Sequence, residues 1–418
     1  MLFILLYLIS LFIAPQLWIE PFVGLRVDLF IYPAWLVWIA VTGRASALFH
    51  IQAQDKFFLA MLVWIVVASA ANGFTENSNR IIQNYVKWFV LFRLVVVTLP
   101  TYTELRRTIL MLLGFGIILA VEGIQHMHSG AGVGWAGQGF AWVDEQAAAA
   151  GVAGRTRWIN IFDGPGVFCV VYTITLPFAL QYLGQPFPVQ RRLLPVLVIL
   201  LLLVATYYTG SRGGFLATVG VFGLYLLTKV NISPTRMLMV GAVLLGVLVL
   251  APAHLTSTSD SHGSAQHRIS MWGEGIEMVQ QNPVFGIGKG NFLGYTGRLI
   301  AHNSMVEIMG ETGMPGLFFW LGIIFMAFKI LAAGYRESQE AINRSYILAL
   351  GLSLAGYLLS SMFVTLEYET FYFLLALAAA VGNNLETKPS FTRRDLLLLS
   401  SIMAAAFVAV KGTVMVYF

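Results

Sequence analysis

Residues Ala301–Ala333 read AHNSMVEIMGETGMPGLFFWLGIIFMAFKILAA, and this stretch decides what kind of protein the chain is. Its first part carries a histidine, an asparagine and two glutamates, whereas the part from Leu317 is apolar apart from Lys329. A helix of roughly 17 to 25 apolar residues can cross a hydrocarbon core of about 30 Å. The stretch therefore predicts polar chemistry at the mouth of a membrane span.

The composition extends this prediction to the whole chain. Of 418 residues, 58% are hydrophobic and 11% are charged, whereas a soluble domain has about 25% charged residues. Apolar runs of spanning length recur throughout, so we expect an all-α, polytopic helical membrane protein in which residues 1–418 form a single integral membrane domain. The net charge of +5 is attributed to membrane orientation and not to nucleic-acid binding.

Thirteen apolar runs are candidate membrane spans. The first, Met1–Ile19, has no cationic residue before it and no small-residue cleavage site behind it, so it is interpreted as a retained span and not as a signal peptide. The predicted span centres are Leu8, Leu36, Val63, Leu91, Gly114, Val171, Leu200, Val221, Leu245, Ile323, Leu352, Leu375 and Ala404.

The basic residues orient these spans. Placing the N-terminus in the cytoplasm puts most lysines and arginines on the inner side, as the positive-inside rule requires. Two long loops, 127–164 and 253–313, then face outward, and the stretch that begins at Ala301 closes the second of them. The inner-side residues are Arg44, Lys56, Arg106, Arg107, Arg191, Arg192, Lys229, Arg236, Lys329, Arg336, Arg344, Lys388, Arg393 and Arg394.

Short helices are expected within the second outer loop. Apolar side chains recur at helical spacing over Ala265–Gln281 and Pro283 follows, which predicts an amphipathic helix along the membrane surface. Another helix should start near Asn303. Along it, Asn303, Glu307 and Glu311 are four residues apart and therefore share a face.

Among the arginines on the predicted outer side, three lie in glycine-rich or short contexts: Arg157, Arg212 and Arg268. Each could anchor a helix end at the headgroup level, or could clamp the phosphate of a lipid with its planar guanidinium. Arg212 has the stronger functional case. It lies in TGSRGG, whose glycines allow close backbone approach, and it precedes the N-terminus of a predicted span.

His302 is the histidine best placed for acid–base chemistry. It lies among polar residues beside a span, and an imidazole with a pKa near 6.5 can accept a proton from a sugar hydroxyl. The alternative is a structural histidine hydrogen-bonded to loop backbone. A metal site is not expected, because His126 and His128 have no third ligand nearby, Asp144–Glu145 is an isolated acidic pair and the single cysteine is Cys169.

The glycine-rich segment GIGKGNF, residues Gly286–Phe292, could suggest a phosphate-binding loop. It lacks the spacing and the following serine or threonine of a P-loop. Its glycines instead favour a tight turn that returns the loop to the membrane.

Four segments together resemble the O-antigen ligase and O-antigen polymerase superfamily (Wzy-C type) of bacterial integral membrane glycosyltransferases. They are SRGG at Ser211–Gly214, R-x-x-x-W at Arg268–Trp272, NPVFGIGKGNF at Asn282–Phe292 and HNSMVEIMGETGMPGL at His302–Leu317. The resemblance covers roughly 157–328. It implies a GT-C-like fold, commonly with twelve spans where thirteen are counted here.

The same resemblance implies the reaction and its location. The donor would be a glycan on undecaprenyl pyrophosphate, at the periplasmic face of the bacterial inner membrane. The acceptor would be lipid A core, in lipopolysaccharide synthesis, or a growing polysaccharide, and ligase and polymerase share these motifs. The transfer would invert the anomeric centre without a metal or other cofactor.

The resemblance also implies roles for individual residues. His302 would serve the acceptor hydroxyl, and Arg212 and Arg268 would bind the pyrophosphate. Arg157 lacks the nearby D-P-N pattern of the family, which leaves open whether Arg155 or Arg157 is the equivalent. The supporting residues would be Ser211, Trp272, Asn303, Glu307 and Glu311.

Two other functions remain open at the level of sequence. A transporter or flippase of lipid-linked or anionic substrates would place ionisable residues inside spans, where Lys87 and Arg93 are the basic candidates. A scaffold in a polysaccharide complex would leave the outward polar residues unexplained. The enzyme hypothesis predicts that His302, Arg212 and Arg268 converge in one outward-facing cavity.

Overall fold

The computed structural model describes residues 1–141, 154–185, 188–229, 258–297 and 299–417. Within these ranges the regular elements are helices, and the β structure is limited to two isolated bridges, Val133 to Gly139 and Ala141 to Arg155. Seven helices of the described chain are long and apolar enough to cross a membrane. The predicted class, an all-α polytopic membrane protein, is confirmed.

The seven helices coincide with seven of the predicted spans. They are α3 (Ala53–Ala71), α4 (Glu76–Thr98), α5 (Tyr102–His128), α7 (Pro165–Leu183), α14 (Ser304–Glu337), α15 (Ala341–Ser361) and α17 (Arg393–Tyr417). Five further predicted centres lie in helices outside these seven: α1 (Leu2–Leu8), α2 (Val27–Val41), α8 (Val189–Tyr208), α9 (Arg212–Lys229) and α16 (Glu369–Val381). Leu245 lies outside the described residues. The total of twelve or thirteen spans stays a prediction.

The first span is shorter in the structure than the predicted Met1–Ile19. Helix α1 continues as a π-helix over Ile9–Ile13 and then stops. Ala14 adopts a left-handed conformation with φ of 51°, directly before Pro15. Proline disfavours helical backbone in the residue before it, which accounts for the helix ending here and not at Ile19.

The backbone contacts divide the chain into two compact units, each assembled from three separate stretches. The first unit takes in Met1–Trp38, Thr103–Ser257 and Glu340–Ser360. Its described helices are α1, most of α2, α5, α7, α8, α9 and α15, and α7 packs against both α8 and α9.

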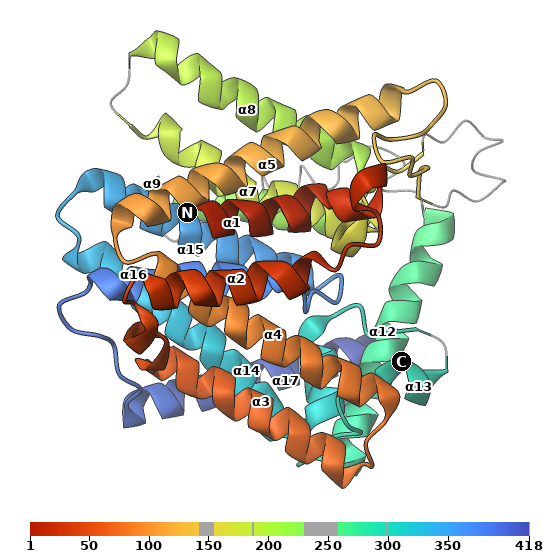
Figure 1. The fold of residues 1–418 in the computed structure, drawn as a ribbon. Coiled ribbons are helices and arrows are strands. Elements are labelled where there is room, and N and C mark those ends of the chain that lie inside the picture. The colour runs from red at the N-terminus through yellow and green to blue at the C-terminus, as the bar shows by residue number, and fades with distance from the viewer. Residues whose placement is uncertain (142–153, 186–187, 230–257, 298, 418) are drawn as a thin grey trace. The chain divides into compact units, whose positions relative to one another are not determined.

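The second unit takes in Ile39–Tyr102, Thr258–Gln339 and Ser361–Phe418. It adds α12 (Thr258–Gln281) and α13 (Phe292–Thr296) to α3, α4, α14, α16 and α17. Figure 1 shows α3 running alongside α14. The two helices are antiparallel, because Phe57 near the start of α3 packs against Gly322 whereas the indole of Trp64 donates to the Thr312 carbonyl at 2.8 Å.

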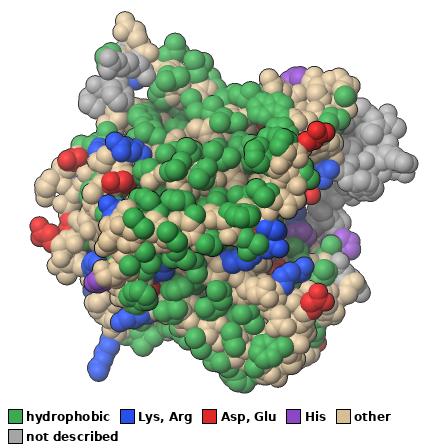
Figure 2. Space-filling view, viewed as in Figure 1, with side chains coloured by type: hydrophobic (Ala, Val, Ile, Leu, Met, Phe, Trp, Pro, Cys, Tyr) green, Lys and Arg blue, Asp and Glu red, His purple; other side chains and the backbone are tan. Residues whose placement is uncertain are grey.

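The surface also indicates a lipid environment. In α1 and α2, Leu2, Leu29, Phe30 and Val37 expose 63%, 57%, 63% and 61% of their area. Figure 2 shows hydrophobic side chains covering much of the face in view. Large contiguous apolar surface is uncommon on soluble monomers, so these helices present the faces expected next to acyl chains.

A kink at Gly313 separates the start of α14 from its membrane span. Gly313 has φ of 69° and ψ of −172°, a conformation available essentially to glycine alone, and Pro315 follows. The prediction of a short helix near Asn303 is therefore confirmed as residues 304–312. The predicted helix Ala265–Gln281 is also confirmed, and it begins earlier, at Thr258.

Candidate functional site

The site in the second unit is built where α12 crosses the first turns of α14. Gly275 and Gly310 lie at the crossing, and a Cβ on Gly275 would come within 2.4 Å of a methyl group of Val306. The two helices can therefore approach closely, because neither glycine has a side chain. The crossing brings the R-x-x-x-W segment of α12 next to the residues that begin α14.

Trp272 holds the loop that carries the histidine. Its indole nitrogen donates to the carbonyl oxygen of Ala301 at 3.1 Å. Arg268 lies one helical turn before Trp272 and therefore shares its face of α12. Arg268 and Trp272, which binds the loop that carries His302, therefore lie on the same side of α12.

The chain turns sharply at His302 to enter α14. His302 has φ of 50°, in the left-handed region that few non-glycine residues adopt. Asn303 is the N-cap, and its side-chain oxygen accepts from the backbone nitrogens of Met305 at 3.1 Å and Val306 at 3.3 Å. The turn leaves His302 partly exposed between a buried Ala301 and a buried Asn303.

The surroundings of His302 favour its neutral form. Burial lowers the pKa of the imidazole, and the positive charge of Arg268 lowers it further. A neutral imidazole can accept a proton, whereas the protonated form cannot. His302 therefore stays unprotonated, and able to act as a base, at lower pH than a histidine with the ordinary pKa of about 6.5.

A buried cluster of charges lies beside the same turns of α14. The Lys289 ammonium contacts a carboxylate oxygen of Glu311 at 2.6 Å and one of Glu367 at 2.5 Å, with all three side chains at most 8% exposed. The hydroxyl of Tyr85 donates to Glu367, and the other oxygen of Glu311 accepts from the backbone nitrogen of Phe292 at 2.8 Å. Burial alone lowers the pKa of Lys289, but the surrounding carboxylates, led by Glu311 and Glu367, outweigh it and raise the pKa above its usual range.

The glycine-rich loop before α13, Gly286–Phe292, positions Lys289 within this cluster. Gly286, Gly288 and Gly290 have φ of 61°, 84° and 89°, which fits the tight turn that the sequence predicts. A Cβ on Gly286 would lie 2.5 Å from the backbone of α14. The carbonyl oxygen of Lys289 accepts from the Ser78 hydroxyl at 2.8 Å, so the loop is tied to α4 as well.

Glu307, a predicted supporting residue, and Ser304 bind the segment between α15 and α16. Glu307 accepts from the Thr365 hydroxyl at 2.8 Å, and the Ser304 hydroxyl accepts from the backbone nitrogen of Leu366 at 2.9 Å. Glu311 holds Lys289 as described above. These contacts immobilise the helix whose N-terminus positions His302.

The predicted phosphate ligand Arg212 lies in the first unit. It is the first residue of α9, and Ser211 caps that helix by accepting from the Gly214 nitrogen at 3.1 Å. Gly210 before it has φ of 57°. Arg212 therefore lies at a helix N-terminus, whose partial positive charge adds to its own.

The structure distinguishes the two arginines that the sequence left open. The side chain of Arg155 packs against Gly210, where an added Cβ would come within 3.1 Å of it, and it is exposed. Arg157 instead donates to Asp163 at 2.8 Å and to the Gly139 carbonyl at 3.0 Å. Arg155 is therefore the one that adjoins the turn before Arg212.

The paired histidines at the end of α5 have separate partners. His126 lies 3.2 Å from the Gly132 carbonyl and stacks on Phe140, whereas His128 lies 3.0 Å from the Tyr208 hydroxyl. Among the described residues, no three histidine, cysteine, aspartate or glutamate side chains are grouped to hold a metal ion.

The structure thus brings some of the predicted site residues close together. His302, Arg268, Trp272 and Asn303 lie together in the second unit, with Glu307 and Glu311 along the following turns. Ser211, Arg212 and Arg157 lie in the first unit, so the convergence of Arg212 with His302 stays a prediction. Sequence reasoning missed Lys289, Tyr85 and Glu367 as partners in one cluster, because Glu367 is 78 positions from Lys289.

The fold and this arrangement define a class: a multi-pass helical membrane protein with a histidine and an arginine beside the start of a kinked span. Residues 197–321 match the family model described as O-antigen ligase. The matched segment includes Arg212, Arg268 and His302, and it confirms the resemblance seen in the sequence. The match supports a glycan-transferring function of the ligase type. Comparison with curated proteins found no significant match.

Proposed function

We propose that the protein is an inverting glycosyltransferase that moves a glycan from undecaprenyl pyrophosphate to an acceptor hydroxyl at the periplasmic face of the bacterial inner membrane. The observation that carries the proposal is the left-handed turn at His302, where burial and the nearby charge of Arg268 lower the pKa of the imidazole. A base and a cation at one place suit the removal of a proton from a hydroxyl next to an anionic leaving group.

The proposed chemistry has one step. His302 takes the proton of the acceptor hydroxyl. The hydroxyl oxygen at the same time attacks the anomeric carbon of the donor from the face opposite the pyrophosphate. The bond from that carbon to the pyrophosphate oxygen breaks, and undecaprenyl pyrophosphate leaves as an anion. Arg212 and Arg268 stabilise the negative charge that develops on it. Because pyrophosphate is already a good leaving group, neither a metal nor a covalent intermediate is required.

A transfer assay with purified protein, undecaprenyl-pyrophosphate glycan and candidate acceptors tests this assignment. We expect Arg212→Ala and Arg268→Ala each to lower the transfer rate roughly 10²- to 10³-fold, the usual loss when a charge-stabilising donor is removed. Arg80→Ala is the matched control, because Arg80 is exposed and donates to the Asn77 side chain one turn away, at 3.1 Å.

The same assay discriminates the remaining arginines. Arg155→Ala should reduce transfer more than Arg157→Ala, because Arg157 already donates to Asp163. Full activity in both Arg212→Ala and Arg268→Ala would remove the basis for a pyrophosphate site formed by these residues. Products with lipid A core indicate a ligase, whereas products on another lipid-linked repeat indicate a polymerase.

The pH dependence of transfer provides an independent prediction. A base acts only when it is unprotonated, and the pKa of His302 is lowered, so the rate should fall as the pH drops through a pKa below the ordinary histidine value of about 6.5. In Arg268→Gln the acid limb should move to higher pH, because the neighbouring positive charge is gone. Arg268→Lys keeps the charge and should leave the limb in place. An acid limb at the same pH in all three proteins would show that the charge of Arg268 does not act on the titrating base, contrary to the proposed site.

The contacts of Arg93 argue against the transporter alternative. This arginine, inside α4, is buried and forms an ion pair with Asp55 at 2.7 Å. It also donates to the carbonyl oxygens of Ala47 and His50 at 2.7 and 3.1 Å. These bonds account for its charge structurally, without a transported ion.

A further inference from the structure

A pocket of about 700 Å³ opens at the start of α3 in the second unit, and its lining includes none of the candidate site residues. It is formed by the segment 50–53, the first turns of α3, Phe319 of α14 and the segment 388–391 that leads into α17. Its dimensions fall in the range of small-ligand sites.

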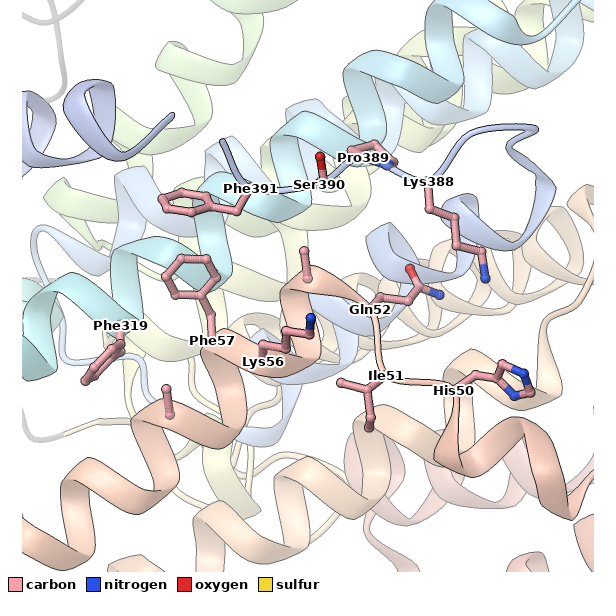
Figure 3. A pocket seen from close by; sticks show the side chains of 12 residues that line it. His50, Ile51, Gln52, Lys56, Phe57, Phe319, Lys388, Pro389, Ser390 and Phe391 are labelled. Atoms are coloured by element: carbon pink, nitrogen blue, oxygen red, sulfur yellow. The ribbon is translucent and has the colours of Figure 1, made fainter. Parts of the chain in front are cut away.

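The lining of the pocket is divided by polarity. Figure 3 shows Lys388, Gln52 and His50 toward one end, Phe57, Phe319 and Phe391 toward the other, and Lys56 between them. The rings of Phe57 and Phe391 meet edge to face with centroids 4.8 Å apart. A polar, cationic end joined to an aromatic end matches a ligand that is itself anionic at one end and apolar at the other.

Two acidic residues that adjoin the pocket-lining segments in the sequence, Asp55 and Asp395, are bound to other cations. Asp55 is buried against Arg93, and Asp395 is bound to Lys329 at 2.5 Å. Across the described chain, neither Lys56 nor Lys388 forms an ion pair. Both are exposed, so their charges are available to an anion that enters the pocket.

The pocket and the glycine-rich loop lie at opposite ends of α3. The far end of α3 adjoins the glycine-rich loop, since a Cβ on Gly288 would lie 3.2 Å from the side chain of Asn72. A 19-residue helix is about 28 Å long at 1.5 Å per residue, close to the thickness of a hydrocarbon core. The pocket and the His302 turn therefore lie toward opposite ends of the same membrane-spanning helices.

We propose that this pocket binds an anionic phospholipid. Lys56 and Lys388 hold the phosphate, and the acyl chains follow Phe57, Ala60 and Phe319 into the hydrocarbon region. The two arginines at the start of α17, Arg393 and Arg394, extend the basic surface toward the headgroups. Basic residues next to a membrane span attract anionic lipids in this way.

Lipid binding to the full-length protein in mild detergent tests the site. Native mass spectrometry and melting curves would compare phosphatidylglycerol with phosphatidylcholine. We expect phosphatidylglycerol to be retained and to raise the melting temperature more. In Lys56→Gln/Lys388→Gln its affinity should fall roughly tenfold or more, since each lysine near a membrane surface contributes roughly a fivefold factor. The control Arg107→Gln/Arg336→Gln removes the same charge from exposed residues outside the pocket.

Several results would overturn the proposal. Equal binding of phosphatidylglycerol by the lysine variant and the wild type would show that the pocket is not the site. Equal stabilisation by phosphatidylcholine would show that charge plays no part. Stabilisation by inorganic phosphate alone, without added lipid, would identify a soluble anion as the ligand. These readouts are independent of glycan transfer, so they stand apart from the proposed reaction.

Discussion

Replacing His302 by asparagine is expected to lower the rate of glycan transfer by roughly 10²- to 10⁴-fold, the range that general-base catalysis contributes. Asparagine tolerates the left-handed conformation that His302 adopts, with φ of 50°. The substitution therefore removes the proton acceptor while keeping the turn into α14. The measurement is the initial rate of transfer at a pH where the wild type is fully active.

Two comparisons separate lost chemistry from lost structure. His267→Asn removes an exposed imidazole from α12, one residue before Arg268, and should leave the rate unchanged. His302→Gly also allows the left-handed turn and leaves space for imidazole added to the buffer, which should restore part of the rate. A His302→Asn protein that melts like the wild type and transfers glycan at the wild-type rate would leave the histidine with a structural role only.

Replacing Lys289 by methionine is expected to destabilise the protein by about 3–5 kcal/mol, the usual cost of breaking a buried ion pair by removing one partner. The side chains of Lys289 and Glu311 are each 2% exposed, so solvent screens the interaction little. Without the ammonium, Glu311 and Glu367 face each other with no cation to bind. The loss is a large share of a typical unfolding free energy of 5–15 kcal/mol.

The unfolding free energy would be measured by denaturant titration in mild detergent. Lys329→Met is the matched control: its side chain is 28% exposed and its partner Asp395 is 13% exposed, so the loss should be about 1 kcal/mol or less. Lys289→Met combined with Glu311→Gln and Glu367→Gln should recover much of the stability, because the uncompensated charges are gone. If Lys289→Met costs no more than Lys329→Met, the buried cluster is not an important source of stability.

Local features of the site could be predicted because they depend on neighbouring residues. The helix of R-x-x-x-W and the helix that starts after Asn303 follow from apolar spacing and from an asparagine able to cap. The glycines of GIGKGNF predict a turn, and all three adopt positive φ. The insertion of Lys289 among carboxylates could not be predicted, because the turn alone does not say which side chains surround it.

The sequence likewise could not show whether Arg155 or Arg157 adjoins the turn before Arg212. Both lie in one short segment, and neither matches the family pattern. Their environments differ through residues remote in the chain: Gly210 adjoins Arg155, whereas Asp163 and the Gly139 carbonyl bind Arg157. Segment packing, and not local spacing, makes this distinction.

The sequence by itself determined that this is an all-α, multi-pass membrane protein, because lipid admits only helices or closed barrels and the apolar runs have the length of helices. It also identified His302 as a candidate base at the start of a span and the family that the chain resembles. Only the tertiary structure decided that α12 brings Arg268 and Trp272 to that histidine, that Lys289 joins Glu311 and Glu367, and that a basic pocket forms at the other end of α3. The physical reason is that hydrophobicity and helix capping act over a few residues, whereas ion pairs and pockets depend on which segments pack together.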